Sequence, residues 1–481
     1  MPHINPRALW ILLVLLGSTL CLAQGPCPTA NSTKSSTIPQ LSSDLICVVP
    51  QVYGPGGLVG TDHGGPLLST ARFSHAAHFS SSALQSFSPL NSEIGTQISQ
   101  LPLTAPVSGF TFSFNPSLGV VSRQTESFGP ILTERADTIG KHRLFLGVSY
   151  QYFNFDKVDD VNLKNFGTVF QHESEHELCS PPNPFITCTP SGEPVFQQDV
   201  IATQNRIDLK VHQVAAVATF GVTDRFDLSV AIPILDVRMG MSSSAVINSF
   251  ETAADRPPCC VHQFDPINPQ IPARENFIAP SQATFFEQRS ASGIGDVILR
   301  GKYEVWKGEK AGLALGLDVH FPTGDERNFL GSGAWGGRPF VTFTYGGRVS
   351  PHGTFGYQRN SASILAGDIT TNSKAHLPDI VTYSAGVDAG LTHRVSASLD
   401  YIGQALIDAK KMASTTFTDA AGTIHQDIRT SSTTINQSYI SLGAKFNPVG
   451  RLLVIANVLF QVNEAGLHSK PVPLIGLSYT F

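Results

Sequence analysis

Apolar and polar side chains alternate strictly along residues 313–321. Leucine, valine or phenylalanine fills every second position, and Asp318 and His320 lie among the small or polar residues between them. Because successive side chains of a strand point to opposite faces, this segment would present hydrocarbon on one face and charge on the other. Such a strand is hard to place in a soluble core, whereas the wall of a membrane barrel places lipid outside and a wet lumen inside.

Eleven further segments carry a similar pattern, and most have at least the 9–11 residues that a tilted membrane strand needs. We therefore predict an all-β fold, a transmembrane antiparallel up-and-down barrel of about twelve strands. The predicted strands are 143–155, 204–220, 225–239, 293–306, 312–322, 338–346, 352–360, 379–389, 393–407, 437–446, 451–461 and 472–481.

The connections between these segments alternate in length. Short turns are predicted at 221–225, 307–310, 346–351, 390–394 and 447–450, and long loops near 156–203, 240–292, 323–337, 361–378, 408–436 and 462–471. Outer-membrane barrels have short periplasmic turns and longer outer loops. The alternation therefore places both ends of the barrel in the periplasm, as an even number of strands requires.

The chain before the barrel divides into three parts. Residues 1–23, with a basic start and a short apolar run, have the features of a secretory signal peptide. Residues 24–105 are rich in Ser, Thr, Pro and Gly, and we expect a polar segment of low order. Residues 106–141 contain a short hairpin that either enters the lumen as a plug or adds two strands to the wall, which would make fourteen. The barrel domain is then 142–481.

The chain ends on an aromatic residue after a regular strand. Ile475, Leu477, Tyr479 and Phe481 form one apolar ridge, opposite Gly476, Ser478 and Thr480. This ending resembles the signal that the bacterial barrel-assembly machinery recognises. We expect that machinery and outer-membrane lipid to be the partners of the C-terminal strand, and the bacterial outer membrane to be the location.

Composition narrows the possible functions. After the apolar run near the N-terminus, the sequence has no uncharged apolar stretch long enough for a membrane helix, although 41% of its residues are hydrophobic. Only 14% of residues are charged, while the chain has 42 glycines and 30 phenylalanines, as expected for many strands with one apolar face. The net charge of −5 argues against nucleic acid as a partner. No sequence pattern indicates a cofactor.

Six of the seven cysteines lie beyond the signal segment, in an exported and oxidising setting where disulfides are expected. Cys179 and Cys188 flank a turn-rich segment and form one plausible pair, and Cys27 and Cys47 form a second. The partners of the adjacent Cys259 and Cys260 cannot be assigned from their positions.

Strand parity also selects candidate lumen residues. We expect nine charged or ionisable side chains to face the interior, and because they carry both signs of charge they select neither anions nor cations. These are Asp208, Lys210, Asp227, Asp296, Arg300, Lys302, Glu304, Asp318 and His320.

Two patterns could indicate catalysis. Residues 172–176 read His-Glu-Ser-Glu-His, the spacing of zinc proteases, but they lie in a polar loop without an amphipathic helix to fix the ligands. We interpret this segment as a solvated loop and expect no metal. Asp318 and His320 are the best catalytic pair, but parity predicts a lumenal charge network more strongly. The glycine-rich segment 323–337 lacks phosphate-loop spacing, and we expect it to fold over the barrel mouth.

Two neighbouring segments resemble a known family. Residues 293–303, Gly-Ile-Gly-Asp-Val-Ile-Leu-Arg-Gly-Lys-Tyr, and residues 315–325, which end in Pro-Thr-Gly-Asp, resemble the outer-membrane proteins of the meta-pathway phenol-degradation family. The turn at 221–225 is similar too, and the resemblance covers roughly 140–481. It implies a barrel that passes hydrophobic or aromatic compounds, without defined catalytic residues. The cysteine-bearing loops and the polar N-terminal region depart from that pattern.

The leading functional hypothesis is therefore an outer-membrane channel or passive transporter for small compounds, with hydrophobic or aromatic ones as the class that the resemblance implies. The first alternative is a structural or adhesive barrel with a closed lumen. The second is a barrel enzyme that hydrolyses lipid or peptide, although we do not expect an enzyme.

Overall fold

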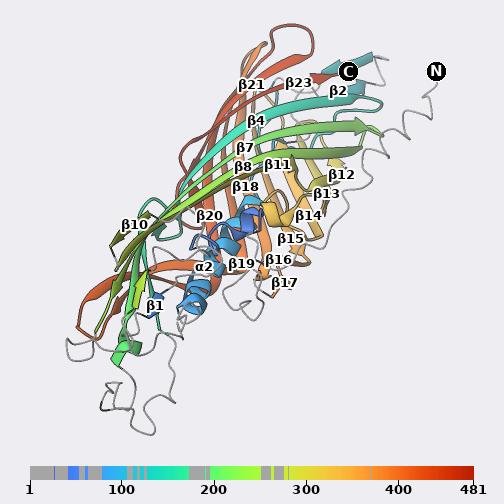
Figure 1. Ribbon diagram of the computed structural model, residues 1–481. Coiled ribbons are helices and arrows are strands. Elements are labelled where there is room, and N and C mark those ends of the chain that lie inside the picture. The colour runs from blue at the N-terminus through green and yellow to red at the C-terminus, as the bar shows by residue number, and fades with distance from the viewer. Residues whose placement is uncertain are drawn as a thin grey trace.

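The computed structural model of the 481-residue chain describes residues 27, 42–53, 60–62, 79–105, 112–115, 120–123, 127–172, 190, 195–250, 262–264, 276–279, 281–369 and 371–481. Most of these residues belong to a closed antiparallel β-barrel (Figure 1). The candidate pair Cys179–Cys188, the unassigned Cys259 and Cys260, and residues 173–176 lie outside the described residues.

Twelve strands form the wall, as predicted. Each is hydrogen-bonded to its neighbours in sequence order, and the last pairs with the first, with Leu477 opposite Val148. β11 and β12 form one continuous strand across a bulge at Gly295 and Asp296. In order around the wall the strands are β4 (Leu144–Val158), β7 (Val200–Gly221), β8 (Phe226–Asn248), β11 (Gln282–Ile294) with β12 (Val297–Lys307), β13 (Ala311–Phe321), β14 (Gly336–Tyr345), β15 (Val349–Asn360), β18 (Asp379–Thr392), β19 (Val395–Thr418), β20 (Ile424–Phe446), β21 (Leu452–Gln461) and β23 (Val472–Thr480).

Smaller elements occupy the connections and the N-terminal region. They are η2 (Leu45–Cys47), β1 (Gly60–Asp62), α2 (Ser80–Ile98), β2 (Phe112–Asn115), β3 (Val120–Arg123), β5 (Val161–Asn162), β6 (Phe166–Gln171), η5 (Val195–Gln198), β9 (His262–Phe264), β10 (Asn276–Ala279), η6 (Glu326–Asn328), β16 (Ala362–Asp368), β17 (Ser373–His376) and β22 (Leu467–Ser469). β2 and β3 pair only with each other among the described strands, so the predicted fourteen-stranded alternative is wrong.

The outer face of the wall is an apolar belt. On β23, Ile475 and Leu477 are 62% and 48% exposed, whereas the alternating Ser478 and Thr480 are buried inside. The predicted ridge at the chain end is therefore confirmed. Because the barrel is closed, the backbone N–H and C=O groups at every edge of a wall strand have a neighbouring strand to pair with. The exposed apolar belt can be stable only in lipid, so the protein is a bacterial outer-membrane barrel.

The polarity of the wall reverses partway along the longest strands. Near the short turns of β8 the outward side chains are apolar and the inward ones polar; farther along, the outward side chains are polar and the inward ones apolar. Outward residues change from Leu228, Val230, Ile232 and Ile234 to Asp236 and Arg238, while inward residues change from Asp227 and Ser229 to Val237, Met239 and Met241. About nine residues from the short turn, a membrane strand reaches its required length, so the reversal marks the edge of the hydrocarbon.

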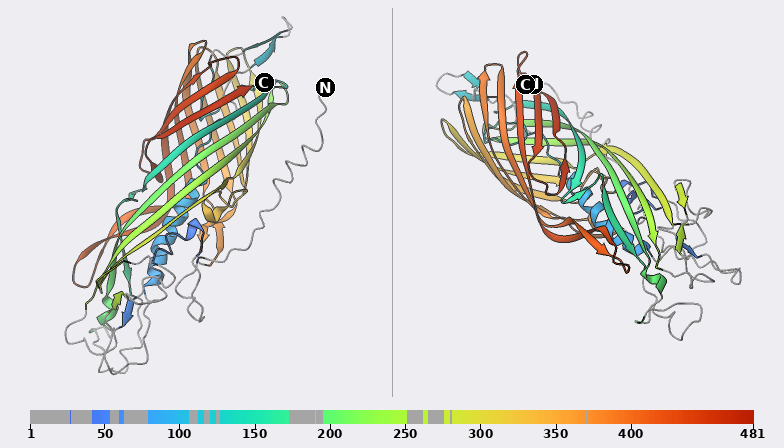
Figure 2. Two further views of the ribbon diagram at one scale, coloured as in Figure 1. Left: turned by 45° about the horizontal axis from the view of Figure 1, so that its top comes forward. Right: turned by 90° about the vertical axis from the view of Figure 1, so that its left-hand side faces the viewer.

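Beyond this edge, strands continue where long loops were expected. β8 and β11 run through much of 240–292, and β19 and β20 leave only residues 419–423 as the connection within 408–436. The prediction of long loops was wrong there because these strands keep pairing after they leave the membrane. Figure 2 shows that the extensions form a second, narrower enclosure on the side of the long connections. β6 lies against β20 and helps to close it.

Helix α2 fills this enclosure (Figures 1 and 2). Phe87, Leu90 and Ile94 are fully buried and pack on the inward apolar face of the extended strands. Gly95 permits the closest approach, because a Cβ there would lie 2.8 Å from side-chain atoms of Phe329 and of Leu365. No helix was predicted within 24–105, since its serines and internal Pro89 hide the apolar spacing. Among described residues, no helix is long and apolar enough to cross a bilayer.

The glycine-rich segment 323–337 folds inward toward the N-terminal region. Arg327 pairs with Asp44 at 2.6 Å, and the Asn328 side chain accepts a hydrogen bond from the Leu45 amide. A disulfide joins Cys27 to Cys47, as predicted from the sequence. These contacts hold the N-terminal region against one outer loop.

Candidate functional site

The N-terminal region crosses the lumen twice before the barrel begins. The first pass is residues 99–105, which continue from the end of α2. The second is the crossing segment, residues 127–141, which leads into β4 near the short turns. The two passes meet where the Ala105 amide donates to the Ile131 carbonyl at 2.9 Å. Residues 99–105 and 127–141 therefore lie inside the wall, bonded to each other and to its strands.

Two buried lysines hold the crossing segment from opposite sides of the barrel. Lys445 on β20 donates to the carbonyls of Phe128 and Pro130 at 3.0 and 2.6 Å. Lys302 on β12 donates to the carbonyls of Arg135 and Asp137 at 2.8 and 2.9 Å. Each ammonium group satisfies main-chain acceptors that would otherwise be buried without partners.

Further strands contribute contacts along the same segment. The Thr133 hydroxyl donates to Asp400 at 3.0 Å, and the same carboxylate accepts from His352 at 2.7 Å. The Ala136 amide donates to Thr344 at 2.9 Å. The segment is irregular because its backbone bonds with the wall instead of with itself.

The first pass is held more loosely. Gln151 donates to the Pro102 carbonyl at 3.0 Å, and the hydroxyls of Thr104 and Ser149 lie 3.2 Å apart. These contacts with β4 are neutral, and so is a long one with β15, in which Gln358 donates to Gln100 at 3.5 Å. This pass therefore has fewer and weaker ties than the crossing segment.

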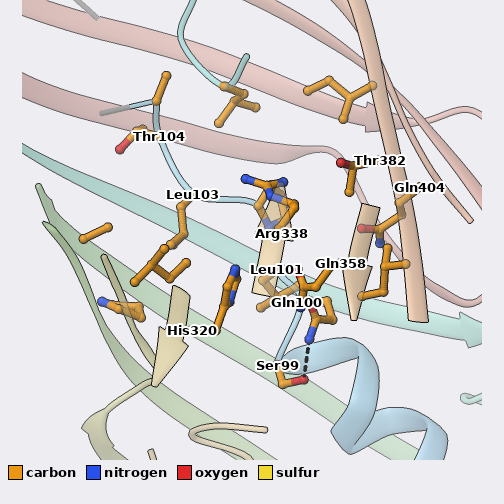
Figure 3. A pocket seen from close by; sticks show the side chains of 18 of the residues that line it. Ser99, Gln100, Leu101, Leu103, Thr104, His320, Arg338, Gln358, Thr382 and Gln404 are labelled. Carbon is orange, nitrogen blue, oxygen red and sulfur yellow. Dashed lines mark hydrogen bonds between the residues drawn. The ribbon is translucent and has the colours of Figure 1, made fainter. Parts of the chain in front are cut away.

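A cavity of about 220 Å³ lies between the first pass and the wall (Figure 3). Its lining combines leucine and isoleucine side chains with a few polar groups. Apolar lining residues include Leu101, Leu103, Leu132, Leu235, Ile298 and Leu330; polar ones include Gln213, His320, Arg338, Gln358, Thr382 and Gln404. This mixture of an apolar wall and a few polar groups is typical of small-molecule sites.

The polar side of the cavity is fixed by an ion network. Asp318 accepts from Arg300 at 2.6 and 2.8 Å and from Arg338 at 2.9 Å. Arg300 also pairs with Glu134 of the crossing segment. The network therefore links three wall strands, β12, β13 and β14, to the crossing segment, and it places the Arg338 guanidinium beside the cavity.

His320 is directed into the same space (Figure 3). Its Nε2 atom is buried and has no hydrogen-bond partner in the part of the chain that the structure describes, and the same holds for Oε1 of Gln213. Both atoms belong to residues that line the cavity. A bound molecule with a hydroxyl or similar group could satisfy one or both.

The structure places seven of the nine predicted lumen residues inside. These are Asp227, Asp296, Arg300, Lys302, Glu304, Asp318 and His320. Asp208 and Lys210 instead lie on the outer face, because the neighbouring inward positions hold Ile207 and Leu209, both buried. The assumption that charge faces the lumen fails for them, since they lie beyond the hydrocarbon edge, where polarity is reversed.

Asp318 and His320 do not form a catalytic pair, and of the zinc-protease pattern only His172 lies among the described residues. Both carboxylate oxygens of Asp318 bind guanidinium groups, so Asp318 does not orient His320. His172 is buried, with its ring 5.2 Å from that of Phe79 and 5.0 Å from that of His262. No group of three potential metal ligands occurs among the described residues.

Sequence reasoning missed Lys445, His352, Asp388 and Asp400, although all four are buried on inward positions. Strand alternation could have selected Lys445, because it lies at an inward position of β20 between the outward positions of Ala444 and Phe446. It could not identify their partner, because the crossing segment has no periodic pattern.

Several solved barrels are similar in fold. An outer-membrane channel from Pseudomonas putida F1 is 10% identical, with a TM-score of 0.40 over 73% of this chain and 99% of that one. A Pseudomonas aeruginosa FadL homologue is 11% identical, with a TM-score of 0.31 over 71% and 90%. The Ralstonia pickettii toluene transporter TbuX is 12% identical, with a TM-score of 0.25 over 71% and 90%.

No protein of curated function matches the sequence. The family described as "Putative MetA-pathway of phenol degradation" matches residues 198–464, which is more than half of the chain and includes all wall strands from β8 to β21. The match agrees with the resemblance seen at 293–303 and 315–325. The chain belongs to this family.

Proposed function

We propose that the protein is a passive channel for small, mainly hydrophobic compounds, which pass through the lumen by way of the cavity. The cavity is the observation that carries this proposal. Its volume of about 220 Å³ suits a molecule of one or two rings, since an engineered apolar cavity of about 150 Å³ binds benzene. The family to which the chain belongs supports an aromatic compound.

The lining supports a solute with a large apolar part and one polar group. Leu101 and Leu103 of the first pass, Leu235 of β8 and Leu330 of the segment 323–337 offer apolar surface. His320 and Arg338 lie on the polar side of the cavity (Figure 3). Burial of the ring removes apolar surface from water, which favours binding by roughly 25 cal/mol per Å² of buried area.

Equilibrium binding to the purified full chain tests this proposal. A fluorinated phenol, followed by the ¹⁹F signal in detergent solution, should bind to the wild type. Leu103→Trp should abolish binding by filling the cavity. Leu228→Trp is the matched control, because Leu228 faces lipid and is 42% exposed. Equal binding by both variants would show that the cavity is not the site.

The closed-barrel alternative is favoured by one observation, the number of wall strands that bind the crossing segment. If that segment never moves, the lumen is sealed and the long extensions form an outer surface. Ion conductance separates the two functions: a channel shows discrete openings in planar bilayers, whereas a sealed barrel stays silent even when the crossing segment is loosened.

A further inference from the structure

The outer face of the wall carries a cluster of basic side chains just beyond the hydrocarbon edge. Lys210 on β7 and Arg238 on β8 are direct cross-strand partners. His212 lies two residues from Lys210 on the same face, opposite Asp236, and Arg206 lies two residues beyond Asp208. We call Arg206, Lys210, His212 and Arg238 the rim patch.

The charges of the rim patch are only partly compensated. Arg238 pairs with Asp236 at 2.8 Å, and Asp208 is shared by Arg206 at 3.1 Å and Lys164 at 2.7 Å. Lys210 makes no ion pair in the described part of the chain. With Lys164 counted beside the three permanent cations of the rim patch, four cations face two carboxylates, on a chain whose net charge is −5.

The pairing of Lys210 with Arg238 is unfavourable by itself, because like charges directly opposite each other in a sheet repel. Both side chains point away from the barrel, and Arg238 is 59% exposed. An external anion between them would remove the repulsion and supply the missing partner of Lys210.

An aromatic row lies directly below the rim patch, toward the hydrocarbon. The Tyr150 hydroxyl lies 2.8 Å from Nδ1 of His212, and the Tyr152 ring is 4.9 Å from the His212 ring. Tyrosines mark the interface between acyl chains and headgroups in membrane barrels. The rim patch is therefore at headgroup height, on the side of the long loops.

A hollow in the outer surface joins the two features. Its volume is about 870 Å³, and its lining includes Tyr150, Tyr152 and Phe286, the four residues of the rim patch, and Asp208, which is held by Arg206 and Lys164. Aromatic walls would contact the upper part of an acyl chain or a sugar. The basic groups would lie beside a negatively charged group of the lipid headgroup.

We propose that the rim patch binds a phosphate group of an outer-leaflet lipid. The Lys210 ammonium and the Arg238 guanidinium are suited to one phosphate, because lysine acts as a point charge and arginine as a planar donor. The site lies outside the lumen, so it is independent of solute passage. It would anchor the extended strands β7 and β8 to the membrane surface.

Binding of lipid A, a phosphorylated glycolipid, to the purified full chain in neutral detergent tests the site. Native mass spectrometry should show one tightly retained lipid A on the wild type. Lys210→Gln with Arg238→Gln should weaken retention about tenfold. The matched control is Lys374→Gln with Arg429→Gln, which removes the same charge from exposed positions outside the rim patch and should retain lipid A.

Three further measurements test whether the phosphate group of the lipid is what the rim patch binds. Dephosphorylated lipid A should bind no better to the wild type than to the rim variant, and 0.5 M salt should reduce binding of lipid A to the wild type. Inorganic phosphate should compete only at high concentration. Equal retention by wild type and rim variant, both shown to be folded by heat-dependent gel mobility, would overturn the proposal, as would equal binding of dephosphorylated lipid. Binding of inorganic phosphate as tight as that of lipid A would also overturn it.

Discussion

Lys302 and Lys445 donate to the same irregular segment from opposite walls of the barrel. β12 and β20 are separated by five strands in either direction around the twelve-stranded wall. Each ammonium group binds two carbonyls that lie two residues apart, Arg135 and Asp137 for Lys302 and Phe128 and Pro130 for Lys445. The crossing segment is thus held at both ends.

The first prediction concerns this clamp. Lys302→Met with Lys445→Met should leave the barrel closed but release the crossing segment, because each unpaired buried carbonyl costs about 1–3 kcal/mol. Planar-bilayer recordings should show larger and more frequent openings than the wild type. Lys374→Met, at an exposed position, is the control. Unchanged conductance would mean that the segment does not control the path.

A second prediction uses Gly443 on the inward face of β20. A Cβ at this position would lie 2.3 Å from the Ile131 side chain and 2.7 Å from that of Asn457. Gly443→Leu should therefore displace the crossing segment while leaving the strand pairing intact. Faster proteolysis within 127–141 would report the displacement. Gly422→Leu tests only backbone strain, since Gly422 has open space but a positive φ; similar proteolysis in both variants would refute the steric explanation.

The third prediction concerns pH and the docking of α2. Burial and the nearby negative charge of Asp159 raise the pKa of Glu93 well above its ordinary range. A buried acid with a raised pKa is held protonated, so its contribution to docking is present at low pH and is lost as pH rises above the ordinary glutamate pKa. The loss is about 1.4 kcal/mol per pH unit until the raised pKa is reached.

Hydrogen exchange of the α2 amides measures this effect. Corrected for intrinsic rates, wild-type protection should fall between pH 5 and pH 8. Glu93→Gln should be more protected than the wild type at pH 8 and nearly independent of pH. Gln97, which donates to Glu93 at 2.9 Å, can keep a partner in that variant. A parallel decline in wild type and variant would rule out Glu93 as the titrating group.

The fourth prediction concerns assembly. The Phe481 ring lies 4.7 Å from that of Tyr479, and the Phe481 amide donates to the Leu144 carbonyl at the closure of the barrel. If the barrel-assembly machinery recognises this end, Phe481→Ser should reduce the assembled protein several-fold in cells. Val449→Ser, in an exposed short turn, is the control. Equal amounts in the outer-membrane fraction would show that Phe481 is not needed for recognition.

The wall could be predicted almost completely from the sequence, because alternation is a direct consequence of strand geometry between lipid and lumen. The limits of that rule are visible at Asp208 and Lys210, where the strand has left the hydrocarbon and apolar residues face α2 instead. The helix and the crossing segment could not be predicted. Pro89 and the serines obscure the helical spacing of α2, and the crossing segment is defined by its carbonyls, which every residue has.

The cavity is lined partly by wall strands, which could be predicted, and partly by the irregular first pass, which could not. His320 was selected by parity, but Leu101 and Leu103 come from a segment without any pattern. Only the part of such a binding site that lies on regular strands can therefore be predicted from the sequence. The predictable residues, Arg300, Asp318 and His320, all lie on wall strands.

The most direct test of the account is solute uptake by intact cells that express the full chain. Uptake of a radiolabelled small phenol should be faster with the wild type than without the protein, should return to the background rate with Leu103→Trp, and should remain fast with Leu228→Trp. Uptake at the wild-type rate by the Leu103→Trp variant, at equal amounts of folded protein, would contradict passage through the cavity.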